Sequence, residues 1–280
     1  EGIRAAIMAS GSPDGRLLQL VRLAPYSVLG SQLTRERSIE MTGEQPSSSC
    51  MIVDPAGLMF ISELGPSAAG GAAGAIYEFL GIRDHDAFPE RVRATVKEVC
   101  DACCQAYTIT AESGEEVQRH CCHVVGPNFA EMYPPLPFPD ADGNVTVDAA
   151  EEAQLQSEAV ELLTVVYRNV LREFIASGLP YARLLPVSGG IFAGRFRSAM
   201  PDLTFRALDA AFAELTPEES AAIAGKSGPV QVDMCIFEEA QFPTFAAALE
   251  AQLMQPALAP GRTAAAVGIS AAPEPAPAAQ

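Results

Sequence analysis

Positive charge is scarce in this 280-residue sequence, which holds 18 Lys and Arg side chains against 35 Asp and Glu and carries a net charge of −17. Non-specific binding to nucleic acid depends on Lys and Arg side chains that neutralise phosphates, so we expect no nucleic-acid partner. Long apolar runs are also absent. None approaches the ~20 residues that a membrane-spanning helix needs, so we expect no membrane partner. An anionic ligand would have to be held by backbone amides and helix N-termini instead of a basic pocket.

Histidine is rare, with three residues, and the seven cysteines are odd in number and lack the spacing of a small disulfide scaffold. We therefore expect reduced thiols in a cytoplasmic protein, with the nucleus as the alternative. Residues 100–104 (CDACC) and 120–123 (HCCH) have the look of zinc ligands. On a strand, however, the side chains of 120–123 would alternate between opposite faces, and buried thiols are ordinary core residues. We predict no metal and no cofactor.

Predicted strands and helices alternate along the chain. Buried apolar runs predict strands at residues 50–53, 107–110, 121–125, 182–187 and 230–237. Helical spacing and capping residues predict helices at residues 65–81, 90–106, 148–177, 203–215 and 238–253, with a short helix opening at 216. This alternation is typical of a three-layer α/β/α sandwich around a central sheet.

We divide the chain into three parts. Residues 38–253 are predicted to form the α/β domain. Residues 1–37 contain two apolar segments, 3–8 and 17–23, separated by a Ser-Pro-Asp-Gly turn, and predict a hairpin extension packed on that domain. Residues 254–280 are rich in Ala and Pro and predict a disordered tail. We expect the protein to be a monomer.

Two glycine-rich loops each follow a predicted strand and lead towards a helix. The first contains residues 70–74 (GGAAG) and the second contains residues 188–194 (SGGIFAG). Glycines let a ligand approach the backbone and permit positive φ, so successive N–H groups can form an anion-binding nest. If the two strands are neighbours, the loops face each other across one cleft, which suits a diphosphate flanked by sugars. The alternative is that both loops are tight turns that allow a helix to pack closely on the sheet.

Two better-known motifs fit this sequence less well. Residues 225–227 (GKS) resemble the end of a phosphate-binding P-loop, but Ser220 stands where the first glycine is required, and a strand follows where a helix should. Ser188 lacks the first glycine of a nucleophile elbow, and all three histidines precede it, against the chain order of that hydrolase fold. We therefore interpret Ser188 as part of a phosphate-binding loop and not as a nucleophile.

Several stretches of the sequence, taken in order, resemble the macro domain family of ADP-ribose-binding modules. They are residues 52–57 (IVDPAG), 70–76 (GGAAGAI), 123–127 (HVVGP), 186–194 (PVSGGIFAG) and 230–245. The resemblance covers residues 38–253. It implies a macro-domain-like fold with a mixed sheet between helices, and a cleft that binds ADP-ribose or an ADP-ribosylated protein.

The resemblance also implies which residues bind the ligand. They are Asp54, Gly70, Gly71, Ala72, Ala73, Ser188, Gly189, Gly190, Ile191, Phe192, Ala193 and Phe237. Residues 70–73 match the family's first loop, and residues 188–194 match the loop that wraps the diphosphate. Phe192 matches the aromatic residue beside the distal ribose, and Phe237 matches the aromatic residue that can stack on adenine.

The sequence departs from the family's pattern at several positions. Asp54 stands in place of an Asn, which puts a carboxylate near the diphosphate, and Ala69 precedes Gly70 where the first loop's glycine pattern is partly lost. The adenine-reading Asp would fall near Ser38, where Glu40 is the nearest acid, and Gly57 replaces the Asn that orients the distal ribose in hydrolytic members. We therefore assign no catalytic residue. Our leading hypothesis is a module that binds ADP-ribose or a related nucleotide diphosphate. The alternatives are a hydrolase of mono-ADP-ribose or O-acetyl-ADP-ribose, and a degenerate domain that acts as a protein-interaction scaffold, with its cleft filled by residues 58–60.

Overall fold

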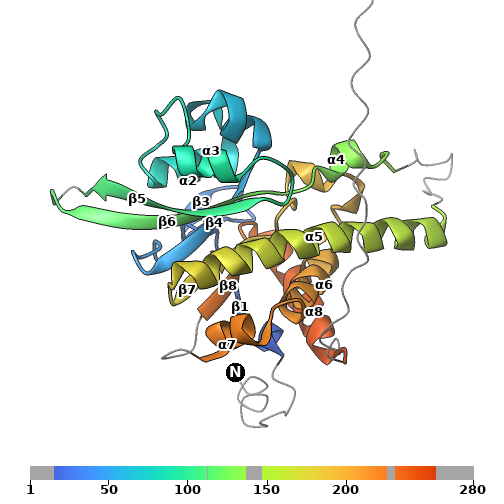
Figure 1. Cartoon of the computed structure of the whole chain (residues 1–280). Coiled ribbons are helices and arrows are strands. Elements are labelled where there is room, and N and C mark those ends of the chain that lie inside the picture. The colour runs from blue at the N-terminus through green and yellow to red at the C-terminus, as the bar shows by residue number, and fades with distance from the viewer. Residues whose placement is uncertain (1–15, 112, 137–146, 226–230, 257–280) are drawn as a thin grey trace, which may run out of the picture.

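The computed structural model describes residues 16–111, 113–136, 147–225 and 231–256 (Figure 1). Two expectations therefore lie outside the described residues, namely the strand at 3–8 and all but the first three residues of the tail at 254–280. None of the helices in the described part of the chain is long and apolar enough to cross a membrane.

A six-stranded mixed sheet forms the centre of the molecule, with the strand order β1-β8-β7-β4-β6-β5. In that order the strands are β1 (Val21–Ala24), β8 (Gln231–Cys235), β7 (Tyr181–Leu184), β4 (Cys50–Ala56), β6 (Glu116–Val125) and β5 (Ala102–Thr110). Every neighbouring pair from β1 to β6 is parallel, and only the edge strand β5 runs antiparallel to its neighbour. The carboxyl ends of the parallel strands consequently lie along one edge of the sheet, where ligands of such sheets bind.

Helices cover both faces of this sheet, which confirms the predicted three-layer α/β/α sandwich (Figure 1). One face carries α2 (Gly71–Phe79) and α3 (Glu90–Thr95). The other face carries α5 (Ala149–Ser177), α6 (Met200–Ala213), α7 (Pro217–Gly225) and α8 (Phe242–Met254). Side chains of β4 alternate between the two layers, so that Met51 and Val53 pack on the α5 side and Cys50 and Ile52 on the α2 side.

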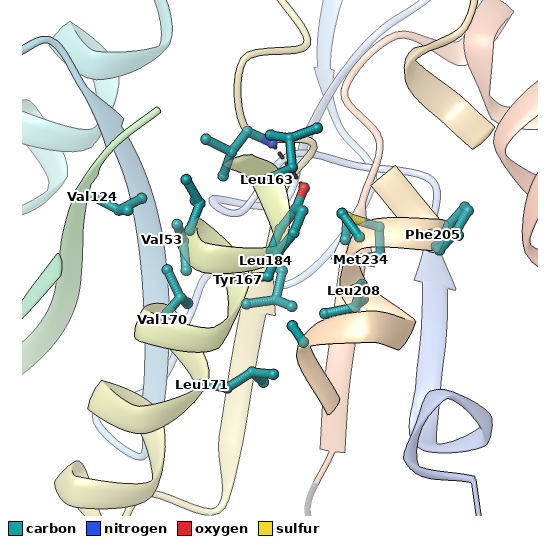
Figure 2. Close-up of a cluster of buried hydrophobic side chains, with 14 of the residues drawn as sticks. Val53, Val124, Leu163, Tyr167, Val170, Leu171, Leu184, Phe205, Leu208 and Met234 are labelled. Atoms are coloured by element: carbon teal, nitrogen blue, oxygen red, sulfur yellow. Dashed lines mark hydrogen bonds between the residues drawn. The ribbon is translucent and has the colours of Figure 1, made fainter. Parts of the chain in front are cut away.

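The longest helix, α5, is the main support of the larger core (Figure 2). Its buried residues Leu163, Tyr167, Val170 and Phe174 recur at the spacing of one helix face, as the sequence predicts. The Asp148 carboxylate caps its first turn by accepting the N–H groups of residues 150 and 151 at 2.8 and 3.0 Å. The predicted start and end of this helix are therefore confirmed.

The predicted helix at residues 90–106 is wrong in its second half. The helix α3 ends at Thr95, and residues 102–110 form β5. Cys100 adopts a positive φ of 76°, and the Asp101 carboxylate accepts the N–H groups of Lys97 and Glu98 at 2.9 and 3.0 Å. This turn reverses the chain, and antiparallel pairing with β6 then outweighs the apparent helical spacing of the valines.

The second apolar segment of the predicted N-terminal hairpin belongs to the main sheet, while the first segment lies outside the described residues. Residues 17–20 form a 3-10 turn with Leu18 fully buried, and β1 follows it directly as an edge strand of the main sheet, with Val21 opposite Val232. The sheet therefore begins before residue 38. Residues 31–41 form a small separate sheet, in which β2 (Ser31–Leu33) pairs antiparallel with β3 (Ile39–Met41).

Candidate ligand site

The two glycine-rich loops leave adjacent strands at the same edge of the sheet. The first follows β4 and the second follows β7, and these strands pair in parallel with Cys50 opposite Tyr181. Because the carboxyl ends of adjacent parallel strands meet at one edge, both loops begin on the edge where a ligand can be held from two sides. The condition stated from the sequence, that the two strands are neighbours, is met.

The first loop presents an uncapped helix N-terminus. The helix α2 begins at Gly71, which has a φ of +56°, and its N-cap residue Gly70 provides no side-chain cap. A Cβ atom built at either glycine would have no heavy atom within 4 Å, so both positions face open space. Ala72 is exposed and Ala73 is half-buried against the core below α2. The Arg83 guanidinium fixes the preceding turn by donating to two carbonyl oxygens, of residues 66 and 67, at 2.7 Å each.

The second loop is held in place from α5. The buried Tyr167 hydroxyl accepts the Val187 N–H at 3.0 Å and donates to the Leu185 carbonyl at 3.2 Å. Burial raises the pKa of Tyr167, so its hydroxyl stays protonated and able to donate. The loop therefore starts from a fixed point between sheet and helix layers.

Ser188 serves the structure of this loop. Its side chain is buried, its φ is +61°, and its Oγ donates to the Pro127 carbonyl at 2.7 Å. A Cβ atom on Gly126 would lie 2.6 Å from that Oγ, so the two loops after β6 and β7 pack with no space for a side chain between them. The Ser188 hydroxyl is thus engaged with backbone, which agrees with its interpretation as a loop residue and not a nucleophile.

The remaining residues of the second loop divide into a buried and an accessible set. Gly189 is half-buried and Ala193 is fully buried, so the side chain of Ala193 faces the interior and not the surface. Gly190 has open space at its Cβ position, Ile191 is 83% exposed, and Phe192 is half-buried. The stretch from Gly190 to Phe192 is therefore the part of this loop that a ligand can reach.

Phe237 lies just after β8 at the same edge of the sheet and is half-buried. Its carbonyl oxygen accepts the Leu33 N–H at 2.8 Å, which places β2 beside it. Ser38, by contrast, is exposed in the turn between β2 and β3, where its Oγ lies 2.8 Å from Thr34 Oγ1 and donates to Glu40 at 3.0 Å. The residue next to Phe237 is therefore Leu33 and not Ser38, because the chain reverses between them.

Asp54 lies in the interior, which corrects its prediction as a ligand-binding residue. Its side chain is 0% exposed on the α2 side of β4, and its Oδ2 lies 2.8 Å from Nδ1 of His123 on β6. The other ring nitrogen of His123 lies 2.7 Å from the Tyr107 hydroxyl on β5. The carboxylate expected near a diphosphate thus belongs to a buried network below the first loop.

Gly57 stands at the end of β4, where a larger side chain would meet the ring of Phe60. A Cβ atom there would lie 3.0 Å from that ring. Of the three residues that would fill the cleft of a degenerate domain, Met59 is 55% exposed, whereas Leu58 and Phe60 pack against the core on the α2 side. The apolar residues after β4 therefore contribute mainly to the core.

An open surface pocket borders the far end of the second loop. It is lined by Ala130, Tyr133, Pro135, Leu136, Gly194, Arg195, Arg197 and Ser198. Gly194 has a φ of +51°, and a Cβ atom on it would lie 2.7 Å from Cα of Ala130 in α4 (Phe129–Met132), so the loop packs directly on that short helix. The Arg195 guanidinium pairs with Glu152 of α5 at 2.6 Å.

The cysteines are all free and buried. Burial raises the pKa of Cys104 to about 12 and that of Cys100 to about 11, so neither thiol forms a thiolate at neutral pH. Within the described ranges of the chain, no group of three or more His, Cys, Asp or Glu side chains is arranged to hold a metal ion.

The sequence matches no protein-family model and no curated protein. Solved structures similar to the chain include an alphavirus P23pro-zbd, with 15% identity, a TM-score of 0.39, and coverage of 75% of this chain and 22% of that one. This chain thus spans less than a quarter of the alphavirus protein. A second is a mutant Oceanobacillus iheyensis macrodomain with ADPR, with 16% identity, a TM-score of 0.41, and coverage of 73% of this chain and 87% of that one. A third is a Trypanosoma brucei macrodomain in complex with ADP, with 13% identity, a TM-score of 0.40, and coverage of 89% of this chain and 95% of that one.

Proposed function

We propose that this protein is a divergent macro-domain-like module that binds ADP-ribose, or a related nucleotide diphosphate, at the carboxyl edge of its sheet. The observation that carries the proposal is the pair of glycine loops on adjacent parallel strands. Three glycines in these loops, Gly70, Gly71 and Gly190, have open space at their Cβ positions. A diphosphate can approach the backbone closely only where no side chain intervenes.

Backbone amides supply the anion binding in this proposal. The N-terminus of α2 carries unpaired N–H groups and the positive end of the helix dipole, and its first turn has no acidic residue. The diphosphate binds between this N-terminus and the second loop. Phe192 then contacts the distal ribose and Phe237 stacks on the adenine ring, so that the ligand runs along the edge of the sheet.

Binding is proposed here, and hydrolysis is not. Gly57 cannot orient a ribose hydroxyl, and its neighbour Phe60 limits the room for a longer side chain. Asp54, the nearest carboxylate on the strand, is fully buried and engaged with His123. The partner of such a module is an ADP-ribosylated protein that presents the same nucleotide group.

Calorimetric titration with ADP-ribose tests the proposal. We expect saturable binding to the wild-type chain and a loss of affinity of at least tenfold in Gly190→Glu, because the new carboxylate would occupy the diphosphate position and repel it. Ala251→Glu, which adds the same charge to the exposed surface of α8, is the matched control and should bind as the wild type does. The absence of both heat and a thermal shift at millimolar ADP-ribose would overturn the proposal.

The salt dependence of affinity offers a second test. The proposed contacts come from neutral amides, and the chain carries a net charge of −17. Raising the salt concentration therefore screens repulsion and removes no Lys or Arg contact. Affinity for ADP-ribose should stay constant or rise between low and moderate salt. A steep fall would indicate a basic site elsewhere on the protein.

A further inference from the structure

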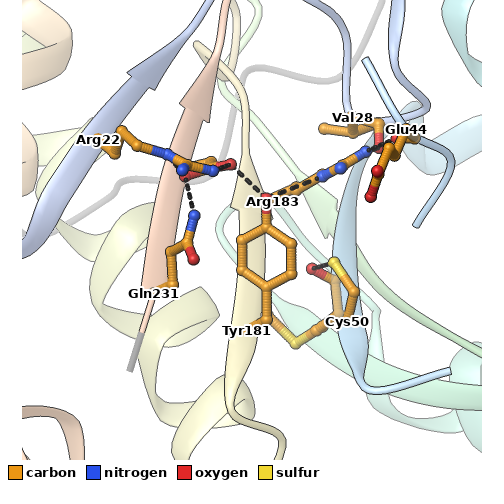
Figure 3. A network of polar contacts seen from close by, with 9 residues as sticks. Arg22, Val28, Glu44, Cys50, Tyr181, Arg183 and Gln231 are labelled. Atoms are coloured by element: carbon orange, nitrogen blue, oxygen red, sulfur yellow. Dashed lines mark hydrogen bonds and ion pairs between the residues drawn. The ribbon is translucent and has the colours of Figure 1, made fainter. Parts of the chain in front are cut away.

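Arg183 of β7 is a buried cation at the base of the β2–β3 hairpin. Its side chain contacts the segment of residues 25–45 and is only 4% exposed. The guanidinium donates to the carbonyl oxygens of Val28 at 3.2 Å and Glu44 at 2.8 Å (Figure 3). These two residues lie on opposite sides of the hairpin in the sequence, so one side chain joins both of its ends.

The sheet orients this guanidinium from three strands. Arg183 Nε donates to the Tyr181 hydroxyl at 3.2 Å, and that hydroxyl donates to Asp233 of β8. Arg22 of β1 binds both carboxylate oxygens of Asp233 at 2.8 Å each. Arg183 itself forms no ion pair among the described residues. Because Asp233 is already neutralised by Arg22, the donors of Arg183 are directed to backbone carbonyls.

The base of the hairpin is tightly packed. The Arg183 guanidinium carbon lies 5.1 Å from the centre of the Tyr26 ring, in reach of a cation–π interaction. A Cβ atom on Gly43 would lie 2.6 Å from that ring, and one on Gly30 would lie 2.6 Å from the Gly43 carbonyl oxygen. A shift of Arg183 would therefore move both ends of the hairpin together.

The other end of the hairpin reaches the ligand edge. Leu33 donates its N–H to the Phe237 carbonyl at 2.8 Å, and Arg35 pairs with Glu239 at 3.6 Å. A continuous set of contacts thus leads from Arg183 through the hairpin to Phe237. The hydrogen bonds and cation–π contacts of the Arg183 side chain go to Tyr26, Val28, Glu44 and Tyr181, which all lie outside the loops that hold the diphosphate in the proposed site.

We propose that Arg183 is a positioning residue that sets where β2 lies against Phe237 and so determines which base the nucleotide site accepts. The proposal rests on the proposed function, since Phe237 is the residue expected to stack on the base. The guanidinium suits this task because its forked donors reach two carbonyls at once, which an ammonium group cannot do.

Base discrimination is the readout that separates positioning from a purely structural role. The dissociation constants of ADP-ribose and of its hypoxanthine analogue would be measured for wild type, Arg183→Met and Arg183→Lys. The control is Arg168→Met, which removes a half-buried arginine that pairs with Glu214 at 2.7 Å in the helical layer on the opposite face. Hydrogen exchange of residues 27–44 would be measured in parallel.

We expect both Arg183 variants to bind ADP-ribose at least tenfold more weakly, with the ratio of the two dissociation constants moving towards one and faster exchange confined to residues 27–44. Arg168→Met should leave the ratio unchanged. If Arg183→Met does not fold, Arg183→Lys alone supplies the comparison. A wild type that binds ADP-ribose while the variants keep its base preference, or a wild type with no base preference, overturns the role of Arg183. A wild type that binds neither nucleotide overturns the proposed function as well.

Discussion

His123 Nδ1 and Asp54 Oδ2 lie 2.8 Å apart, and neither side chain has any exposed surface. The pair joins β6 to β4 under the helix that carries the first glycine loop. The Tyr107 hydroxyl contacts the other ring nitrogen, and Tyr77 of α2 lies beside the carboxylate. Burial, followed by the negative charge of Asp54, raises the pKa of Tyr77, so this hydroxyl stays protonated. A network of buried polar side chains on three strands, namely Asp54, His123 and Tyr107, therefore lies between the sheet and α2.

Removing Asp54 should be costly because Nδ1 of the buried His123 would lose its hydrogen-bond partner. We expect Asp54→Ala to lower the free energy of unfolding by about 3 kcal/mol in urea titrations. Asp202→Ala is the matched control, because Asp202 forms an exposed pair with Arg206 and should cost less than about 1 kcal/mol. The double variant with His123→Ala should cost less than the sum of the two single variants. Equal effects of Asp54→Ala and Asp202→Ala would contradict the importance of the network.

Two glycines with positive φ predict different costs for a methyl group. Gly178 (φ +67°, ψ +7°) lies in the left-handed helical region, where alanine costs about 1–2 kcal/mol, whereas Gly194 (φ +51°, ψ −131°) has the angles of the first central residue of a type II′ turn, which glycine dominates because a Cβ atom is strained there. At Gly194 the added Cβ would also lie 2.7 Å from Cα of Ala130, whereas at Gly178 it would meet nothing within 4 Å. Gly194→Ala should therefore destabilise the protein by about 1–3 kcal/mol more than Gly178→Ala in urea unfolding. Similar costs would mean that the second loop moves away from α4 freely.

The sequence was sufficient to predict the layers, the long helix and the two loops, because each of these depends on local patterns. Asp148 and Gly178 mark the ends of α5, and the glycines of both loops mark breaks after apolar strands. The sequence could not show whether the strands before the two loops are neighbours. The parallel pairing of β4 with β7 in the structure shows that they are.

The errors arise where distant segments decide the outcome. Asp54 was assigned to the ligand because its position in the chain matches the family, and only the parallel pairing of β4 with β6 places His123 next to it. Likewise, Leu33 lies beside Phe237 because the β2–β3 hairpin folds back, and no local pattern fixed that register. The Asp101 turn was a local signal that could have ended the helix at 90–106 earlier.

The start of the folded domain can be tested with two fragments. The fragment 16–256 contains β1, the buried Leu18 and Arg16, which pairs with Asp209 of α6 in the interior. The fragment 38–256 lacks all three. We expect the first to unfold cooperatively in urea and the second to lack a cooperative transition, as followed by circular dichroism. A cooperative 38–256 fragment would restore the boundary predicted from the sequence.

We predict that Glu219 makes a small and pH-dependent contribution to the free energy of unfolding. Its carboxylate accepts the Thr216 N–H at 2.8 Å and the Arg172 Nε–H at 2.9 Å. Burial acts to raise its pKa, but these bonds outweigh burial and lower it from the ordinary value of 4.5. A lowered folded-state pKa means that the stabilisation is present above the unfolded-state pKa and is lost as pH falls through the folded-state value.

We therefore expect Glu219→Gln to lower the free energy of unfolding at pH 7 by less than about 1 kcal/mol, since Glu219 is only half-buried and solvent screens its ion pair with the exposed Arg172. The difference from wild type should shrink at acidic pH, as pH falls through the lowered folded-state pKa of Glu219. Glu218→Gln, at the exposed neighbouring position in the first turn of α7, is the control and should change stability less at pH 7. A Glu219→Gln effect that is the same at pH 7 and at acidic pH would show that charge is not its cause.

The seven buried thiols should resist modification in the native protein. Burial raises the pKa of Cys50 and Cys104 to about 12, and it raises the pKa of Cys121, Cys122 and Cys235 well above the ordinary value. At pH 8 a thiol with a pKa near 12 is ionised to about one part in ten thousand, and the thiolate is the reactive form.

Titration with a thiol-reactive chromogenic disulfide should therefore give seven equivalents in urea and almost none over the same time in buffer. Ser113→Cys places one thiol in the exposed turn between β5 and β6 and should react rapidly with one equivalent in the native state. Rapid native labelling of the wild type would mean that β5, the edge strand carrying Cys103 and Cys104, opens under native conditions. Since α5 packs on this strand, such opening would extend to the helix that anchors the second glycine loop through Tyr167.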